Sequence, residues 1–425
     1  MKLRNNLINI TNRDFVYSLI SQRIGSFLPP DMQEIYNKFE HIKIISTDAY
    51  FIHYSLYPFL RSRNEDLMLE EARKFCGEYM SGERYQTLKT MTTLDDELSL
   101  IYSIALTKYI VGKLRGLLES NPISSSIASS LSSLGGEFIG ELLKGAVEEA
   151  EAVTKNAEEI RELMGGKNAG KEAGTFQKIL NLSKQMMFVE ELKQIVKMSK
   201  RMMEFVPKAT KISKIRGRTG DELAGYVLTK HADRALPREL ALPEEMFVLK
   251  LASEGFLSKE KLRVSEGAYY VLIDKSGSMV GEKTVWARSV AMAIYRMSMA
   301  KRRKFFLRFF DTKVHPGKPI CDGREAVDAI LKVQSNGGTD ITNAISTAIE
   351  DLEEKFSEFS NTIIVITDGE DVVEDLSKEL RKVGASLISV MIQGNNETLK
   401  NISDHYVKAE LSERGGEKVL KLVAN

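Results

Sequence analysis

Oxygen-bearing side chains gather at three points in the second half of the 425-residue sequence. Segment 274–278 (DKSGS) and segment 368–370 (DGE) each follow a short apolar run. Between them lies segment 336–340 (NGGTD), whose glycines allow the backbone to turn tightly. Together these segments supply carboxylates and hydroxyl groups from Asp274, Ser276, Ser278, Thr339 and Asp368.

The chemistry of these side chains is that of a hard cation site. Carboxylate and hydroxyl oxygens without His or Cys select Mg²⁺, Mn²⁺ or Ca²⁺ over zinc. The two carboxylates balance the charge of one divalent ion, while hydroxyl groups and waters fill the other positions. No general base and no second metal cluster accompany them, so the pattern favours binding over hydrolytic catalysis.

The elements that must position these segments alternate between strands and helices. Short apolar runs occupy 268–274, 304–310, 362–367 and 386–392, and amphipathic segments occupy 284–300, 325–333, 341–356 and 376–383. This alternation predicts an α/β domain, a Rossmann-like and mostly parallel sheet with helices on both faces. Ligands of such sheets bind beyond the carboxyl ends of the strands, where the strand order changes direction. Both acidic segments follow strands at that edge.

The first half of the chain has helical apolar spacing up to about Leu240 and predicts an all-α region over 1–235. Helices are expected over 95–118, 137–164 and 176–205, with flexible stretches near 121–136 and 165–175. Segment 236–243 (LPRELALP) is bounded by prolines and marks a connector over 236–267. The α/β domain then covers 268–425.

The three oxygen-rich segments resemble the metal-ion-dependent adhesion site of von Willebrand factor A (VWA) domains. That site is Asp-x-Ser-x-Ser, then Gly-Gly-Thr before a helix, then Thr-Asp-Gly after a later strand; all its positions occur between about Ala268 and Lys408. The resemblance implies one bound Mg²⁺ or Mn²⁺. Ser276, Ser278 and Thr339 would bind the ion, with Asp274 and Asp368 binding directly or through water. A partner protein would complete the coordination with an Asp or Glu carboxylate.

The helical region followed by segment 236–243 also resembles the intracellular subgroup of VWA proteins that partner MoxR-type AAA+ ATPases. This second resemblance implies an interaction module without enzymatic activity. Such a module acts as adaptor or cofactor of the ATPase in the assembly or remodelling of client complexes.

The composition fits a cytoplasmic location. Lys and Arg total 60 against 59 Asp and Glu, so the net charge of +1 argues against a chain-wide affinity for nucleic acid or membranes. No apolar run approaches the roughly 18 residues of a membrane span, and the start of the sequence has no secretory signal. Cys76 and Cys321 cannot form the disulfide framework common in extracellular proteins.

Two local patterns suggest weaker interpretations. Segment 165–171 (GGKNAGK) matches the start of a phosphate-binding P-loop, but Glu172 stands where Ser or Thr should bind Mg²⁺, and a helix precedes it. ATP binding is therefore not expected. Segment 193–218 is strongly basic and only Glu204 opposes it. We interpret it as a solvated helix face and linker, with peripheral membrane contact as the alternative.

Two other functions compete with the interaction module. Ro-type ribonucleoproteins also join a large helical domain to a VWA domain, but their helical part is repetitive and strongly basic, unlike this one. A metal-dependent hydrolase such as a phosphodiesterase would need the base and second metal that the pattern lacks. Salt-sensitive retention of RNA would favour the ribonucleoprotein; metal-dependent co-purification of an ATPase would favour the interaction module.

Overall fold

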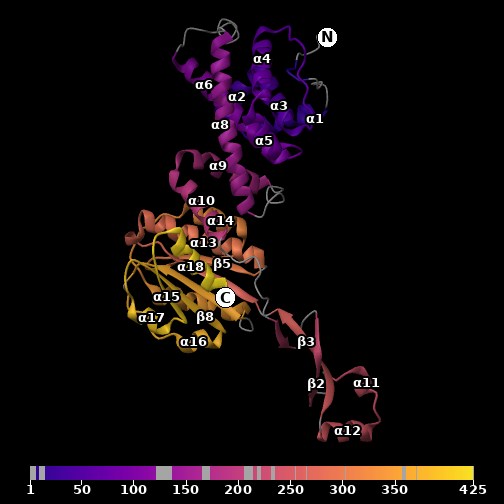
Figure 1. Cartoon of the computed structure of the whole chain (residues 1–425), viewed down its shortest axis with the longest axis vertical. Coiled ribbons are helices and arrows are strands. Elements are labelled where there is room, and N and C mark those ends of the chain that lie inside the picture. Colours follow the sequence, from indigo (N-terminus) through magenta and orange to yellow (C-terminus); the bar gives the residue numbers. More distant parts are fainter. Residues whose placement is uncertain are drawn as a thin grey trace. The chain divides into compact units, whose positions relative to one another are not determined.

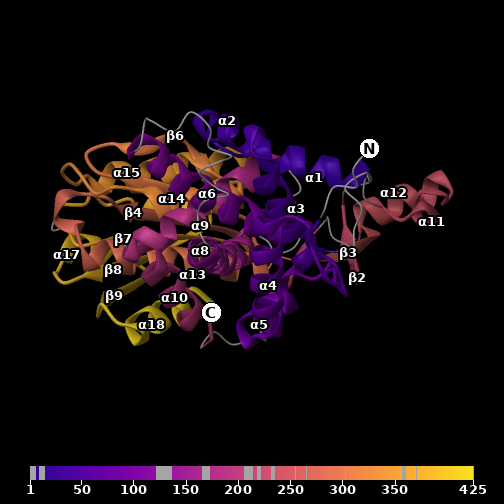
Figure 2. The same ribbon diagram turned by 90° about the horizontal axis from the view of Figure 1, so that it is seen from above.

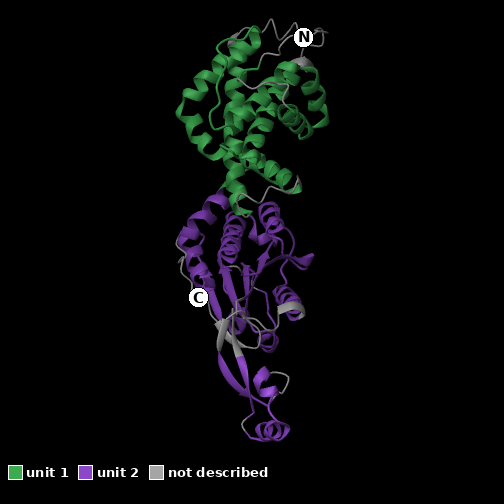
Figure 3. Cartoon of the chain, turned by 90° about the vertical axis from the view of Figure 1, so that its right-hand side faces the viewer, with its two compact units in different colours: residues 1–193 green, residues 194–425 purple. Residues whose placement is uncertain are grey.

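The computed structural model describes residues 6–8, 15–120, 136–164, 173–204, 214–217, 222–230, 235–253, 255–264, 266–301, 303–356, 360–369 and 371–424. Two compact units divide the chain, residues 1–193 and residues 194–425, and Figure 3 colours them separately. The stretches predicted to be flexible fall mostly outside the described residues, at 121–135 and 165–172.

The first unit is built from helices, as the sequence predicts. They are α1 (Phe15–Ser26), α2 (Pro30–Lys38), α3 (Glu40–Tyr54), α4 (Leu67–Ser81), α5 (Glu83–Thr92), α6 (Asp96–Ser120), α8 (Gly136–Leu163), α9 (Ala173–Phe188) and the start of α10 (Glu190–Glu204). The long helix α8, seen nearly end-on in Figure 2, packs against α6 and α9. None of the helices in the described part of the chain combines the length and apolar character needed to cross a membrane.

One helix predicted over 176–205 is two helices in the structure. The chain breaks between Phe188, the last residue of α9, and Glu190, the first of α10. Val189 donates its backbone N–H to Gln185 O, and the next turn starts again at Glu190 and Glu191. These acidic residues favour a helix N-terminus, a signal that the continuous apolar stripe obscured.

Residues 214–264 differ from the sequence prediction of helix and connector. They contain the strands β1 (Lys214–Gly217), β2 (Glu222–Thr229) and β3 (Phe256–Val264) in an antiparallel sheet of order β1-β3-β2. The short helices α11 (Pro237–Leu240) and α12 (Glu244–Ala252) lie between β2 and β3 in the sequence. The sequence of β3, FLSKEKLRV, contains no continuous apolar run. Its partners β1 and β2 lie far from it in the sequence, so no local pattern reveals the pairing.

The C-terminal part is a mostly parallel six-stranded sheet with flanking helices, as predicted (Figure 1). Its strands are β4 (Glu266–Asp274), β5 (Phe305–Phe310), β6 (Val314–Ile320), β7 (Ser360–Thr367), β8 (Ala385–Ile392) and β9 (His405–Ala409), in the order β6-β5-β4-β7-β8-β9. Only β6 runs antiparallel to its neighbour. Its helices are α13 (Glu282–Lys301), α14 (Gly323–Lys332), α15 (Ile341–Phe356), α16 (Ser377–Lys382), α17 (Glu397–Ile402) and α18 (Glu413–Ala424).

Side chains alternate between the two faces of the central strand β4, because successive residues of a strand point in opposite directions. Tyr270 and Leu272 join the buried apolar cluster formed with α15, whereas the Tyr269 hydroxyl donates to Val423 O of α18. Covering both faces makes β4 fully buried from Ala268 to Ile273, and this burial fixes the position of its carboxyl end.

Candidate metal site

Two acidic residues meet at the carboxyl ends of neighbouring strands. Asp274 is the last residue of β4, and Asp368 directly follows β7, which pairs with β4 in parallel. β4 also pairs with β5 on its other side, so the strand order changes direction at β4. Loops that leave β4 and β7 therefore lie together at the edge of the sheet where ligands bind in open α/β domains.

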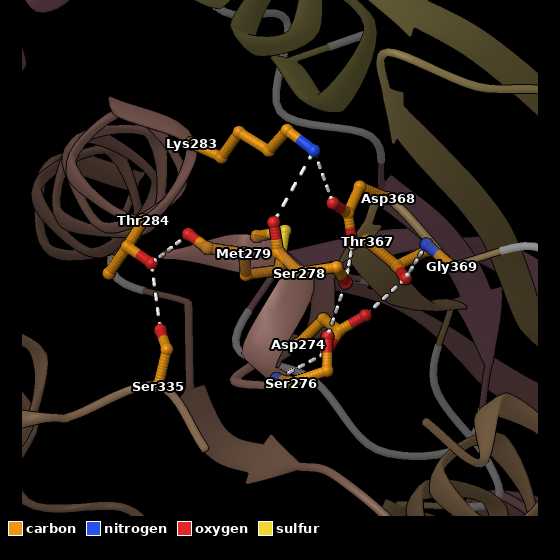
Figure 4. A network of polar contacts seen from close by, with 10 residues as sticks. All are labelled: Asp274, Ser276, Ser278, Met279, Lys283, Thr284, Ser335, Thr367, Asp368 and Gly369. Atoms are coloured by element: carbon orange, nitrogen blue, oxygen red, sulfur yellow. Dashed lines mark hydrogen bonds and ion pairs between the residues drawn. The ribbon is translucent and has the colours of Figure 1, made fainter. Parts of the chain in front are cut away.

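Hydrogen bonds link four of the five predicted site residues into one chain (Figure 4). The Asp274 carboxylate accepts from Ser276 N (2.8 Å) and from Thr367 Oγ1 (2.5 Å). The Ser276 and Ser278 hydroxyl oxygens lie 3.0 Å apart. Ser278 Oγ in turn donates to Asp368 Oδ1 at 2.8 Å. These contacts join Asp274, Ser276, Ser278 and Asp368 in one continuous network.

Thr339, the fifth predicted residue, lies against Gly369 of the loop that follows β7. A Cβ atom added to Gly369 would lie 2.8 Å from Thr339 Cγ2. The segment before Thr339 is fastened to the loop after β4, because Gly277 N donates to Gly337 O at 2.9 Å. Gly337 adopts a φ of +100°, a conformation that favours glycine and explains its place in this turn.

Replacing Gly369 by alanine tests this contact. The new methyl group would lie closer to Thr339 Cγ2 than carbon atoms of side chains approach one another, so Thr339 or the loop of Gly369 must shift. If its hydroxyl binds the ion, we expect Gly369→Ala to weaken divalent-ion binding by about the same factor as Thr339→Ala, roughly tenfold for one lost neutral ligand interaction. Isothermal titration calorimetry measures both. Gly317→Ala is the control, because a Cβ atom there meets nothing within 4 Å; unchanged affinity in Gly369→Ala would contradict the placement.

The buried carboxylate of Asp274 is held in an unfavourable environment. Its residue is 2% exposed. Burial raises the pKa of Asp274, and the nearby Asp368 carboxylate adds to this effect, although hydrogen bonds from Thr367 and Ser276 oppose it. A divalent cation between the two carboxylates would supply the charge that favours the ionised form. The donor set and its electrostatics thus fit such an ion.

Two residues that the sequence prediction missed also shape the site. Asp371 Oδ2 accepts from Ile341 N at the start of α15 (3.1 Å), which ties the loop of Asp368 to the helix that follows Thr339. Lys283 in the first turn of α13 donates to Asp368 Oδ2 at 2.6 Å. Its position was a usable signal, since a cation is unfavourable in the first turn of a helix.

The other sequence signals fall partly outside the described residues. Segment 165–171, with its P-loop likeness, is outside them, and so is 205–213 of the basic segment. In the described part of that segment, Lys193 pairs with Glu190 at 3.3 Å and Arg201 pairs with Glu413 at 2.6 Å. These two cations therefore already have acidic partners within the chain.

Comparisons with known proteins agree with this fold. The family described as VWA domain containing CoxE-like protein matches residues 256–395. Two proteins of Methanocaldococcus jannaschii are similar over most of the chain: uncharacterized protein MJ0811 (27% identical, covering 71% of this chain and 74% of the relative) and uncharacterized protein MJ0077 (25% identical, covering 80% and 85%). A solved von Willebrand factor type A structure from Catenulispora acidiphila is 18% identical, with a TM-score of 0.31, and covers 39% of this chain and 43% of that one. The match to the family model supports a VWA domain in the C-terminal part of the chain.

Proposed function

We propose that this protein is a metal-dependent interaction module that captures a carboxylate of a partner protein at the edge of its VWA domain. The observation that carries the proposal is the hydrogen-bonded chain from Asp274 to Asp368 at the switch point of the sheet. Asp274, Ser276, Ser278, Thr339 and Asp368 would hold one Mg²⁺ or Mn²⁺. When bound, the ion would attract an Asp or Glu side chain that these carboxylates alone would repel.

Exposed apolar side chains near the site in the sequence support binding to a protein. Val280, two residues after Ser278, is 64% exposed, and Val372, four residues after Asp368, is 76% exposed. Ser278 is itself exposed, so the site opens to the surface. A partner carboxylate could bind the ion, while apolar side chains beside it would pack against these valines. Protein interfaces commonly combine charged and apolar contacts in this way.

The partner that we propose is a MoxR-type AAA+ ATPase, with the chain serving as its adaptor or cofactor in the remodelling of client complexes in the cytoplasm. This step rests on the resemblance of the helical region and its VWA domain to proteins that partner such ATPases. It assigns no catalytic reaction to the chain itself.

Binding to a purified MoxR-type ATPase from the same organism tests the proposal. Affinity is measured with Mg²⁺, with EDTA, and with Mg²⁺ for the Thr339→Ala variant. EDTA should abolish binding, because it leaves the carboxylates of Asp274 and Asp368 facing that of the partner, and like charges repel strongly in a partly desolvated site. Thr339→Ala should weaken binding about tenfold through weaker ion binding, while both carboxylates remain.

The control is Thr347→Ala. Thr347 lies on α15, the helix that begins shortly after Thr339, and its hydroxyl donates to Asn343 O of the same helix. Equal affinity under all three conditions would mean that the partner docks elsewhere and that the metal site has another role.

A further inference from the structure

A lysine already contacts one of the two carboxylates that the proposed metal site requires. Lys283 Nζ lies 2.6 Å from Asp368 Oδ2 and 3.3 Å from the main-chain oxygen of Ser278 (Figure 4). The Asp368 side chain is 2% exposed and that of Lys283 is 24% exposed. The ion pair is therefore largely shielded from water. Charges in such a shielded position interact more strongly than charges on an open surface.

Lys283 lies in an electrostatically unfavourable position near the start of α13, and its contact with Asp368 compensates for this. It is the second residue of α13, where the helix dipole and the free backbone N–H groups repel a cation. An acidic residue such as its neighbour Glu282 is the usual choice there. A residue that breaks a local rule at the edge of a binding site points to a role in that site.

The ammonium group and a divalent ion would compete for the same oxygens. Ser278 Oγ donates to Asp368 Oδ1, and Lys283 donates to Asp368 Oδ2, so both oxygens of this carboxylate already accept a hydrogen bond. An ion held by Asp368 would also be repelled by the positive charge beside it. Both effects act in the same direction and lower the affinity for the ion.

We propose that Lys283 is an internal counter-cation of the metal site, which neutralises Asp368 in the metal-free protein and competes with the divalent ion. This inference rests on the proposed function, because it takes the Asp274–Asp368 site as the place where the ion binds. Half-occupancy of the site then requires a higher ion concentration than it would without Lys283, because the ion must either displace the ammonium group or bind beside its positive charge.

Calorimetric titration of Mn²⁺ into the full chain tests the role of Lys283. Lys283→Met keeps the length of the side chain and removes its charge, and we expect it to bind Mn²⁺ at least tenfold more tightly than wild type. Lys283→Arg retains the charge and should stay within about threefold of wild type. Lys283→Gln should reproduce the tighter binding, and circular dichroism establishes that each variant is folded.

Lys382→Met is the matched control. Lys382 also forms a lysine–carboxylate pair, with Glu353 at 2.5 Å, near the end of α15 that is opposite to Thr339. The affinity of the Lys382→Met variant for Mn²⁺ should equal that of wild type. Equal or weaker binding in folded Lys283→Met and Lys283→Gln, with wild type binding normally, would overturn the inference and leave the proposed metal site intact. Absence of binding in wild type and in all Lys283 variants would overturn both.

Discussion

Without divalent ions, the Asp274→Asn variant should unfold at a higher temperature than the wild-type chain. The wild-type carboxylate is buried and its pKa is raised, first by burial and then by the charge of Asp368. Asparagine removes that charge and keeps an oxygen that can accept from Ser276 N. An increase of ~1 kcal/mol in the free energy of unfolding would raise the melting temperature by about 2–4 °C in a domain of this size.

Adding Mg²⁺ should reverse this order. The ion stabilises whichever chain binds it in the folded state, by about 2.7 kcal/mol at a concentration one hundred times the dissociation constant. Wild type should gain this stability, whereas Asp274→Asn should gain little, because it lacks one of the two charges that attract the ion. Differential scanning calorimetry with EDTA and with Mg²⁺ measures all four combinations.

Asp322→Asn is the matched control for this experiment. Asp322 also accepts a backbone N–H two residues later, from Arg324 at 2.7 Å, but it caps α14 and is exposed to solvent. It should respond to Mg²⁺ as wild type does. If Mg²⁺ stabilises Asp274→Asn and wild type equally, Asp274 does not bind the ion.

The same carboxyl group sets a pH dependence in the metal-free protein. Because the folded-state pKa of Asp274 lies above its unfolded value, the folded chain binds the proton more tightly. Stability should therefore fall as the pH rises from the usual carboxyl pKa of about 4 through the raised folded value. Asp274→Asn should lack this part of the decline when unfolding is followed at several pH values in EDTA.

The second large effect is expected in the helical unit, where Arg161→Met should destabilise the fold by about 3–5 kcal/mol. The Arg161 side chain on α8 is 3% exposed and lies 2.7 Å from Asp95 Oδ2 and 2.5 Å from Glu158 Oε2. Asp95 also accepts from Leu98 N at the start of α6. Removing the guanidinium group would take the buried cation away from three poorly solvated carboxylates, those of Asp95, Glu158 and Glu97, the last at 3.8 Å from Arg161 Nη1.

Urea denaturation, followed by helical circular dichroism, measures this loss. The control is Arg84→Met, since Arg84 pairs with Glu148 at 3.5 Å and both side chains are well exposed, at 72% and 52%. Exposed pairs contribute about 0–1 kcal/mol, so this variant should resemble wild type. Similar midpoints for Arg161→Met and Arg84→Met would show that the buried cluster does not stabilise the unit.

The sequence predicts the α/β domain well because its signals are local. The runs that form β4, β5, β7 and β8 are apolar and short, and each is separated from the next by a segment of helical length. Parallel strands buried on both faces produce this pattern directly. The same pattern predicts that Asp274 and Asp368 lie at one edge of the sheet, and the parallel pairing of β4 with β7 places them there.

Features that depend on distant pairing could not be predicted in this way. The sheet of β1, β2 and β3 joins segments rich in charged residues, such as 258–263, whose partners lie far along the sequence. The edge strands β6 and β9 and the helices α17 and α18 also went unpredicted. Lys283 could be noticed as an unusual residue near a helix start, but its contact with Asp368 depends on the three-dimensional approach of α13 to the loop after β7.

One divalent ion should bind to the oxygens of Asp274, Ser276, Ser278, Thr339 and Asp368. Titration of Mn²⁺ into the intact wild-type chain, followed by electron paramagnetic resonance of the free ion, tests it most directly. We predict one bound ion per chain, with binding lost in Asp274→Asn and weakened in Thr339→Ala. No bound ion in wild type, or one ion bound equally well by all three proteins, would mean that these residues do not form the metal site.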